Sequence, residues 1–212
     1  MPDPREGHAA ETVEVRTARL RLSPVDASGP EERAALAACW GDPRTWAHLP
    51  SGCPTDDAWV EPWIAGHVRS RARTGLGWWL VRLVGPVGSV PVGTIVGAGG
   101  CALIEGLAAW NLGYRLTPDV WGYGVATELA VAGLQAAREA DPGLPVTARV
   151  LERNPASWHV LEKVGLTLVW SGVISGGDAM TAGLCRRIYA DRPLSADLLA
   201  GLIALEQVDR RR

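Results

Sequence analysis

Apolar and polar residues along the chain recur with two periods, and together they predict seven strands and five helices. Period-two alternation or short apolar runs bounded by Gly and Pro mark the strands, whereas i, i+3, i+4 spacing marks the helices. The order β-α-α-β-β-β-α-β-α-β-β-α is typical of a mixed, mostly antiparallel sheet in an α/β (α+β) domain. The predicted strands cover 13–22, 77–84, 92–104, 110–116, 146–151, 166–174 and 184–190. The predicted helices, with their capping residues, cover 30–40, 55–73, 125–140, 154–165 and 195–208.

Capping residues indicate where three of these helices begin or end. The Asp-Pro-Gly sequence at 141–143 ends the helix over 125–140, whose small apolar residues form one face. Asn154 and Pro155 suit the N-cap and first positions of the next helix, and Gly165 suits the C′ position after it. Ser195 is the expected N-cap of the last helix.

A chain of 212 residues suits one domain with a single core. We expect a flexible tail over residues 1–12, one domain over 13–193, and an amphipathic helix over 194–212 appended to that domain. The apolar stripe of this last helix must be buried, either on its own domain or on a second subunit, so a monomer and a homodimer both stay open. The stripe consists of Leu198, Leu199, Leu202, Ile203 and Leu205.

Composition excludes several classes of protein. A net charge of −2 gives no basic excess for nucleic acid. Residues 83–104 carry no charge, but eight Gly and Pro residues among these 22 positions predict two buried strands and no membrane helix. The four scattered cysteines form no C-x-x-C pair, so no metal site is expected. The N-terminus lacks the apolar segment of a signal peptide, which favours a cytoplasmic location with reduced thiols.

The residue usage carries further information. Ala, Gly, Pro, Arg and Val are abundant, which suggests a GC-rich bacterial genome. Lys163 is the only lysine, and the chain has ten Trp but no Phe. The tryptophans are therefore expected to take the core positions that Phe commonly fills.

The segment over 110–128 has the local order of a phosphate site. A predicted strand passes through a proline turn into a loop containing Gly122 and Gly124, and the loop begins the helix at Val125. Amides of such a loop and of the first helical turn have no partner within the helix, and they favour an anion. A plain turn is the alternative interpretation. The spacing matches neither the dinucleotide fingerprint nor a P-loop.

A second segment, Asn154 to Leu166, accompanies the first. Together with Gly113-Tyr114 and the Trp-Gly-Tyr-Gly-Val-Ala-Thr-Glu run at 121–128, it resembles the GCN5-related N-acetyltransferase (GNAT) superfamily. The resemblance is to the RimJ/RimL-like branch of ribosomal-protein N-acetyltransferases and extends over about residues 17–192. It implies a GNAT fold with splayed strands at the acyl-CoA site, acetyl-CoA as co-substrate and no metal.

The resemblance also implies roles for individual residues. The backbone of Leu116 is placed along the pantetheine arm, with a backbone N–H near it as oxyanion donor. Asn154 is placed on the pantetheine arm, Ser157 near the thioester sulfur and Lys163 on the adenosine phosphate side. The alternatives are a plain N-cap for Asn154 and a solvated helix residue for Lys163. Residues placed around the pyrophosphate are Tyr123, Gly124, Val125, Ala126 and Thr127.

The implied reaction is direct attack of a neutral primary amine on the thioester carbonyl through a tetrahedral intermediate. Many relatives carry a Glu just before the Gly-Tyr strand and a Tyr four residues after the Ser position, but this chain has Asn111 and Leu161. Neither residue moves a proton, so the base is unassigned. Glu105 is a candidate base, with a plain exposed acid of the hairpin as the alternative, and Ser157 is the candidate donor to the leaving thiolate. Tryptophans in the segments that flank the acceptor cleft in the family are Trp46, Trp59, Trp63, Trp78 and Trp79.

Three functions follow from these patterns. The first is an acetyl-CoA-dependent N-acetyltransferase that acts on a small-molecule or peptide amine. The second is an acyl-CoA-binding protein with little turnover, which the missing Glu and Tyr favour. The third is a phosphosugar or nucleotide binder, which leaves the pattern at 154–166 unexplained. The sequence does not identify the amine, although few acids in the predicted cleft disfavour a polycation.

Overall fold

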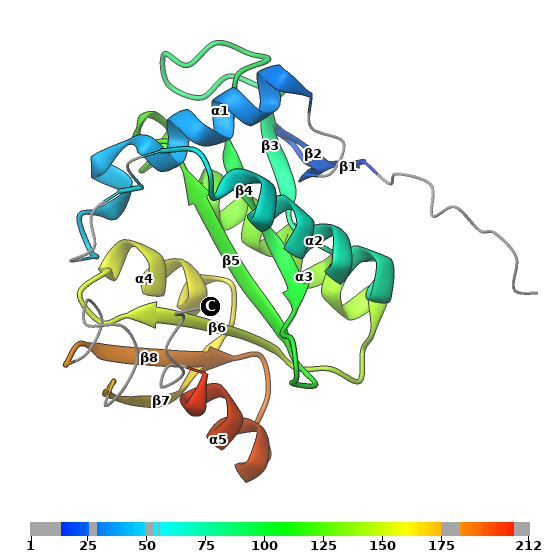
Figure 1. The fold of residues 1–212 in the computed structure, drawn as a ribbon, viewed down its shortest axis with the longest axis vertical. Helices are drawn as coiled ribbons and strands as arrows, with labels where there is room; N and C mark the ends of the chain where they lie inside the picture. The colour runs from blue at the N-terminus through cyan, green and yellow to red at the C-terminus, as the bar shows by residue number, and fades with distance from the viewer. Residues whose placement is uncertain (1–13, 26–28, 50–52, 55, 175–182, 206–212) are drawn as a thin grey trace, which may run out of the picture.

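The computed structural model describes residues 14–25, 29–49, 53–54, 56–174 and 183–205. In this part of the chain, eight strands form one open sheet in the order β1-β2-β3-β4-β5-β6-β8-β7 (Figure 1). All neighbours are antiparallel except β5 and β6, which are parallel. The strands are β1 (Val15–Arg16), β2 (Leu20–Pro24), β3 (Trp79–Leu83), β4 (Ile95–Leu103), β5 (Trp110–Leu116), β6 (Val146–Leu151), β7 (Thr167–Val173) and β8 (Cys185–Ala190).

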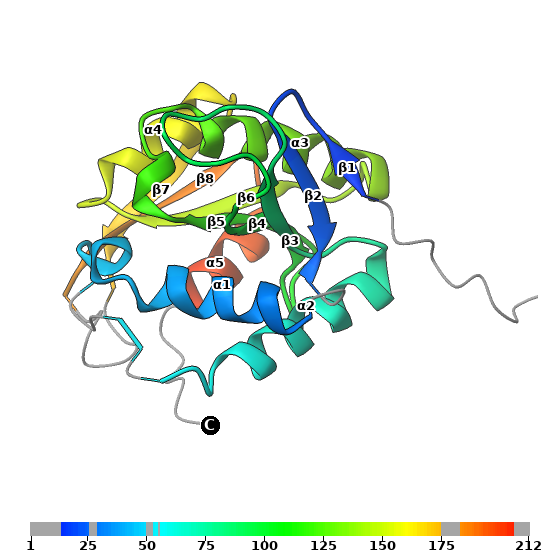
Figure 2. The same ribbon diagram turned by 90° about the horizontal axis from the view of Figure 1, so that it is seen from above.

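Helices cover both faces of this sheet (Figure 2). α1, α2 and α5 lie on one face, and α3 and α4 lie on the other. The main core forms between the sheet and α3, where Trp110, Leu129 and Tyr189 are fully buried. The helices are α1 (Pro30–Gly41), α2 (Val60–Thr74), α3 (Val125–Ala140), α4 (Pro155–Lys163) and α5 (Ala196–Ala204), with short 3-10 turns η2 (Pro43–Trp46) and η3 (Pro118–Val120). This is the predicted α/β class.

The sheet opens between β5 and β6. The two strands pair only at Trp110↔Val146 and Asn111↔Thr147, and the rest of β5 pairs with β4 alone. The backbone N–H of Trp110 donates to Pro145 and its carbonyl accepts from the Thr147 hydroxyl, so the polar groups of Trp110 point toward β6. Because these groups alternate along a strand, those of Leu112, Tyr114 and Leu116 also point into the opening.

The first predicted strand is wrong in one respect and gives the sheet its eighth strand. The alternation over residues 13–22 predicts one strand, but the chain turns at residues 17–19 and forms the β1–β2 hairpin. Within the turn, the amide of Thr17 donates to the Leu20 carbonyl at 2.9 Å, and the hydroxyl of Thr17 accepts from the Leu20 amide at 3.1 Å. The turn also binds Glu128 from α3, a contact that alternation along the strand does not reveal.

The start of the second helix is also later than predicted. Asp56 caps a local turn by accepting from the Ala58 amide at 3.0 Å, and α2 begins at Val60 after Trp59, which makes no side-chain cap bond. Asp side chains at such positions compete with the helix for backbone amides, which explains the shift. α3, β5 and β6 have the predicted limits. Gly165, after α4, has the positive φ of 90° expected for a residue at C′.

The last helix packs on its own domain. Leu202 of α5 is fully buried in a cluster with Ile104, Ala109 and Ile188, and the Ser195 hydroxyl caps the helix at Leu198. The predicted tail over residues 1–12, the turn at 175–178 and the end of the last helix beyond 205 lie outside the described residues. The charge-free segment at 83–104 contributes the end of β3 and the whole of β4. Within the described part of the chain, no helix has the length and apolarity to cross a membrane.

Candidate active site

The loop between η3 and α3 has the geometry of an anion site. Gly122 and Gly124 have positive φ values of 80° and 79°, a conformation that residues with a Cβ rarely adopt. Among the described residues, the six consecutive backbone amides of residues 122–127 have no hydrogen-bond partner. Unpaired amides at the start of a helix, together with the helix dipole, bind phosphate groups. The predicted residues Tyr123 to Thr127 therefore lie together in a loop that can hold a pyrophosphate.

The β1–β2 turn holds this loop in place. The Glu128 carboxylate accepts from the Thr17 hydroxyl at 2.5 Å and from the amide and the Nε of Arg19, both at 2.8 Å. Arg19 Nη2 completes the ion pair at 2.8 Å, and Nη1 donates to the Tyr123 carbonyl at 2.8 Å. Burial alone would raise the pKa of Glu128, but the hydrogen bonds and charge of its partners lower it below its ordinary value. Turning the Tyr123 carbonyl toward Arg19 leaves the amides of the loop free for a ligand.

Sequence reasoning missed Thr17 and Arg19 as residues of the site. They lie 111 and 109 positions from Glu128, and nothing in the local pattern connects the segments. The signal that could have indicated them was Glu128 itself, an acid at the end of the 121–128 motif with no basic residue near it in the sequence.

A cavity of about 600 Å³ lies beside the loop. Gly124 and Thr127 line it together with Lys163 from the end of α4, and the outer face of α3 supplies Val131 and Gln135. The only lysine thus lies in the same cavity as the start of α3, although 39 residues separate it from Gly124. This arrangement fits the predicted position of Lys163 on the adenosine side of the cofactor.

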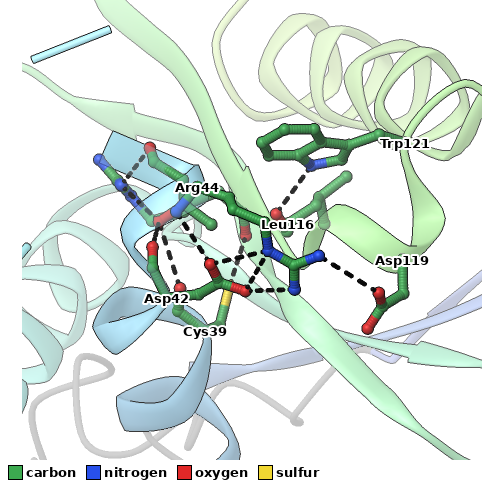
Figure 3. Close-up of polar contacts among 8 residues, drawn as sticks. Cys39, Asp42, Arg44, Leu116, Asp119 and Trp121 are labelled. Atoms are coloured by element: carbon green, nitrogen blue, oxygen red, sulfur yellow. Dashed lines mark hydrogen bonds and ion pairs between the residues drawn. The ribbon is translucent and has the colours of Figure 1, made fainter. Parts of the chain in front are cut away.

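The end of β5 forms the next part of the site. The Leu116 carbonyl accepts from the Trp121 indole N–H at 3.0 Å, and Figure 3 shows the indole lying across Leu116. This bond occupies the carbonyl of Leu116 and leaves its amide directed into the opening between β5 and β6. An amide at this place can serve as the predicted oxyanion donor.

Asn154 and Ser157 lie at the start of α4, on the other side of the opening. The Asn154 side-chain carbonyl accepts from the Ser157 amide at 3.3 Å, which is the predicted N-cap. Tyr114 of β5 donates its hydroxyl to the Ser157 carbonyl at 3.3 Å, and burial raises the pKa of Tyr114 to about 12, so the phenol keeps its proton. The Ser157 side chain also interacts with the Tyr114 phenol, so its hydroxyl lies at the edge of β5 that faces the opening.

The opposite face of β5 meets a segment we call the η2 segment, residues 42–49. Arg115 Nη1 donates to the Thr45 carbonyl at 2.8 Å and to its hydroxyl at 3.1 Å, and the guanidinium lies 3.8 Å from the centre of the Trp46 ring. Arg153, just before α4, donates to the His48 carbonyl at 2.5 Å. The η2 segment is thus attached to both sides of the opening.

Further ion pairs hold the same segment. Arg44 pairs with Asp42 at 2.6 Å and reaches Asp119 of η3 at 3.9 Å (Figure 3). Cys39 of α1 donates to the Arg115 carbonyl at 3.9 Å, and burial raises the pKa of this thiol to about 12. Both carboxylates of this region are therefore engaged, and the thiol is neutral.

An aromatic cluster lies between α1, α2 and the sheet. Trp40 stacks on Trp59 with ring centres 5.1 Å apart, and Trp63 packs edge-on against both His67 and Trp78. Trp78 covers Gly113 of β5, where an added Cβ would lie 2.6 Å from its ring. A residue with a side chain at 113 would displace Trp78, which explains the glycine. Trp46 also packs in this cluster, whereas Trp79 is buried in the main core.

Glu105, and the residues Asn111 and Leu161 at which this chain differs from the motif, lie away from the loop at 121–124. Glu105 is exposed in the turn before β5 and has no hydrogen bond or ion pair with the described residues. The loop at 121–124 follows the other end of this strand, so the strand's length, roughly 20 Å, separates Glu105 from it. The structure therefore does not bring Glu105 to the loop. Asn111 is half-buried next to Gly113, and Leu161 is buried in the main core.

The donor set of the site suits a phosphorylated thioester. Free amides and one lysine face the phosphate side, and strand amides face the opening, as a substrate with phosphates at one end and amides along its arm requires. No group of three or more His, Cys, Asp or Glu residues that could hold a metal ion occurs in the described ranges.

The comparisons with known proteins agree with this geometry. The family model for the acetyltransferase (GNAT) domain matches residues 19–167. The chain therefore belongs to the GNAT acetyltransferase family, whose members use acetyl-CoA as acyl donor. A search of curated protein sequences finds no significant match.

Solved structures share the fold at low sequence identity. A GNAT-family acetyltransferase from Bacillus anthracis is 18% identical, with a TM-score of 0.64 over 84% of this chain and 97% of the other. An acetyltransferase from Agrobacterium tumefaciens is 22% identical, with a TM-score of 0.64 over 85% and 95%. RimL, a ribosomal L7/L12 α-N-protein acetyltransferase, is 15% identical, with a TM-score of 0.61 over 86% and 94%. At these identities the likeness concerns the fold.

Proposed function

We propose that this protein transfers the acetyl group of acetyl-CoA to a primary amine, in the manner of the RimJ/RimL-like branch. The observation that carries the proposal is the run of six amides at residues 122–127, which have no hydrogen-bond partner in the described part of the chain. This run lies at the wide end of the opening between β5 and β6. A pyrophosphate on these amides directs the attached arm into the opening. The thioester then lies between the amide edge of β5 and the start of α4.

The reaction proposed is direct attack of the neutral amine on the thioester carbonyl. The amide of Leu116 or of a neighbouring residue of β5 donates to the oxygen as it becomes negative. Ser157 supplies a hydroxyl to the sulfur as the thiolate leaves, because it projects from the helix that borders the opening. Fixing both reactants in line supplies much of the rate acceleration.

The amine also has to lose a proton. Glu105 is the proposed base, and its exposed position requires that water carry the proton to it over the length of β5. Replacement of Glu105 by Gln tests this role through the pH dependence of kcat/KM, with Asp57→Asn, at an exposed acid outside the cofactor cavity, as control. An unchanged acidic limb in the Glu105→Gln profile contradicts the role.

Amine-dependent release of CoA-SH tests the function itself. We expect release with at least one member of a panel of amino acids, short peptides, polyamines and aminoglycosides, together with a mass increase of one acetyl group on that amine. Acetyl-CoA that binds with no release for any amine would favour the acyl-CoA-binding alternative. A protein that binds neither acetyl-CoA nor CoA contradicts both proposals.

A further inference from the structure

Among the described residues, Arg115 has no carboxylate partner. Its Nη1 donors bind Thr45, but among the described residues Nε and Nη2 have no hydrogen-bond partner and no acid forms an ion pair with the guanidinium. Neither nitrogen is fully buried, so both Nε and Nη2 remain accessible to solvent. Three N–H donors of one guanidinium are thus free on a side chain that is otherwise partly buried.

The charge of Arg115 is held in a desolvated place. Its guanidinium lies against Trp46 and within 5.6 Å of the Trp40 ring centre, and burial lowers its pKa to about 10. The group is still charged at neutral pH. A partly buried cation is costly unless a partner compensates it, and in this structure ring contacts and neutral oxygens supply all of that compensation.

The surroundings of Arg115 add positive charge and no free negative charge. Asp42 is paired with Arg44, and Cys39 is neutral. Burial, followed by the charges of Arg115 and Arg153, lowers the pKa of His48 to about 4, so this ring is neutral and both cations lie near it. Within the described chain, the net charge of this surface is therefore positive.

The position of Arg115 relates this charge to the reaction. Arg115 precedes Leu116 in β5, but its side chain extends to the face of α1, whereas Leu112 and Tyr114 face α3. The loop at 121–124, α3 and α4 occupy the cofactor side. An acceptor must approach the thioester from the face that carries Arg115, because the proposed cofactor site lies on the other face.

We propose that the amine acceptor carries a carboxylate and that Arg115, assisted by the charge of Arg153, binds it. The free Nε and Nη2 donors match the two oxygens of a carboxylate in the side-on, bidentate geometry. Such a cation also lowers the pKa of a nearby ammonium group, which favours the neutral amine that attacks. This inference rests on the proposed acetyl transfer and names its substrate class.

The carboxylate can be the α-carboxylate of a free amino acid or a side-chain carboxylate of a peptide, and the experiment separates these two sources. One arm compares a set of free amino acids with their α-amides, and each rate is divided by the fraction of substrate whose amine is neutral. The other compares Ser-Glu amide with Ser-Gln amide, in which the attacking amine is the same and only the carboxylate differs. We expect kcat/KM to be about tenfold or more higher for the carboxylate member of at least one pair, the scale of a hydrogen bond to a charged group.

Three variants test the role of Arg115. Arg115→Met should bring the preference within about threefold, and Arg115→Lys should retain part of it, because lysine keeps the charge without the bidentate fork. Thr45→Val is the matched control, since it removes the hydroxyl that Arg115 binds and leaves the guanidinium in place. It should lower the rates for both members of a pair in the same proportion. Circular dichroism and melting curves check that each variant folds.

Binding measured by calorimetry on the CoA-loaded protein separates this inference from the proposed function. If no amine is acetylated but the carboxylate ligand binds and Arg115→Met abolishes binding, the proposed transfer fails and the inference about Arg115 stands. Equal rates and equal binding for the two members of every pair in the wild type overturn the inference. An Arg115→Met variant that loses both members equally also overturns it, because that result indicates a purely structural arginine.

Discussion

Glu128 offers a quantitative test of the contact between the β1–β2 turn and the phosphate loop. Replacement by Gln keeps the shape but removes the charge and turns an NH₂ group toward either the Thr17 side or the Arg19 side. The carboxylate accepts three hydrogen bonds, from the Thr17 hydroxyl and from the amide and Nε of Arg19, and Nη2 of Arg19 adds an ion pair. Whichever way the new amide turns, its NH₂ group faces two of these four contacts, which are lost or become repulsive.

The expected loss follows from these contacts. Each hydrogen bond to a charged group contributes about 1.5–3 kcal/mol, so two of them give roughly 3–6 kcal/mol. The Arg19 side chain is 31% exposed and the Glu128 side chain 15%, so solvent recovers part of this energy. We expect a loss of about 2–4 kcal/mol, which for a domain of this size lowers the melting temperature by roughly 4–16 °C.

The pH dependence gives an independent check. The pKa of Glu128 is lower in the folded protein than its ordinary value of 4.5, so its stabilisation is present above that value and is lost as the pH falls through the folded pKa. The difference in stability between wild type and Glu128→Gln should therefore shrink on acidification below about pH 4.5.

The assay is urea denaturation at several pH values, together with calorimetry of acetyl-CoA binding. The control is Glu139→Gln on the exposed face of α3, which should change stability by less than about 0.5 kcal/mol. Equal denaturation midpoints for the two variants at pH 7 would refute the reasoning. Loss of stability without loss of acetyl-CoA affinity would show that the contacts of Glu128 with Thr17 and Arg19 support the fold but do not orient the loop.

Four further predictions concern single sites. Gly124→Glu places a side chain on a residue with φ of 79° and a negative charge among the free amides, and calorimetry should show at least about a tenfold loss of acetyl-CoA affinity in a folded variant. Ser157→Ala should lower kcat by roughly ten- to a thousandfold while the acetyl-CoA Kd stays within about threefold, and a wild-type kcat defeats the role. Leu202→Ala should cost about 2–5 kcal/mol in chemical denaturation, whereas Leu168→Ala on the exposed part of β7 should cost much less, and similar losses would contradict the packing of α5. Glu105→Gln should remove the acidic limb of the kcat/KM profile if Glu105 is the base, and an unchanged limb excludes it.

Local chemistry explains why much of the fold was predictable. The helix over 125–140 has a small apolar face, a glycine before it and an Asp-Pro-Gly sequence after it, and α3 has the predicted limits. The cap at Asn154 and the glycine at C′ define α4 in the same way. The glycine turn at 121–124 could be predicted because its signals are contained within eight residues, whereas its role as an anion site stays a prediction.

The parts that sequence did not predict depend on contacts between distant segments. The turn at Thr17 and Arg19 is bound by Glu128, and no periodic pattern relates positions more than 100 residues apart. The late start of α2 reflects competition between an Asp-capped turn and the helix, which composition does not decide. Arg115 lies in a strand whose two faces both pack against helices, so its surroundings became known only with the η2 segment in place.

The short pairing between β5 and β6 also has a mechanical consequence. Only two residue pairs join the five strands on one side to the three on the other, so the backbone ladder resists little rotation about Trp110 and Asn111. Side-chain hydrogen bonds also restrain the two halves of the sheet. Tyr114 of β5 binds the Ser157 carbonyl of α4, and Arg115 and Arg153 both bind the η2 segment. Substitution of Tyr114, Arg115 or Arg153 should therefore change the width of the opening between β5 and β6. Hydrogen exchange of the β5 amides reports on this opening, and we expect faster exchange when any of these three hydrogen bonds is removed.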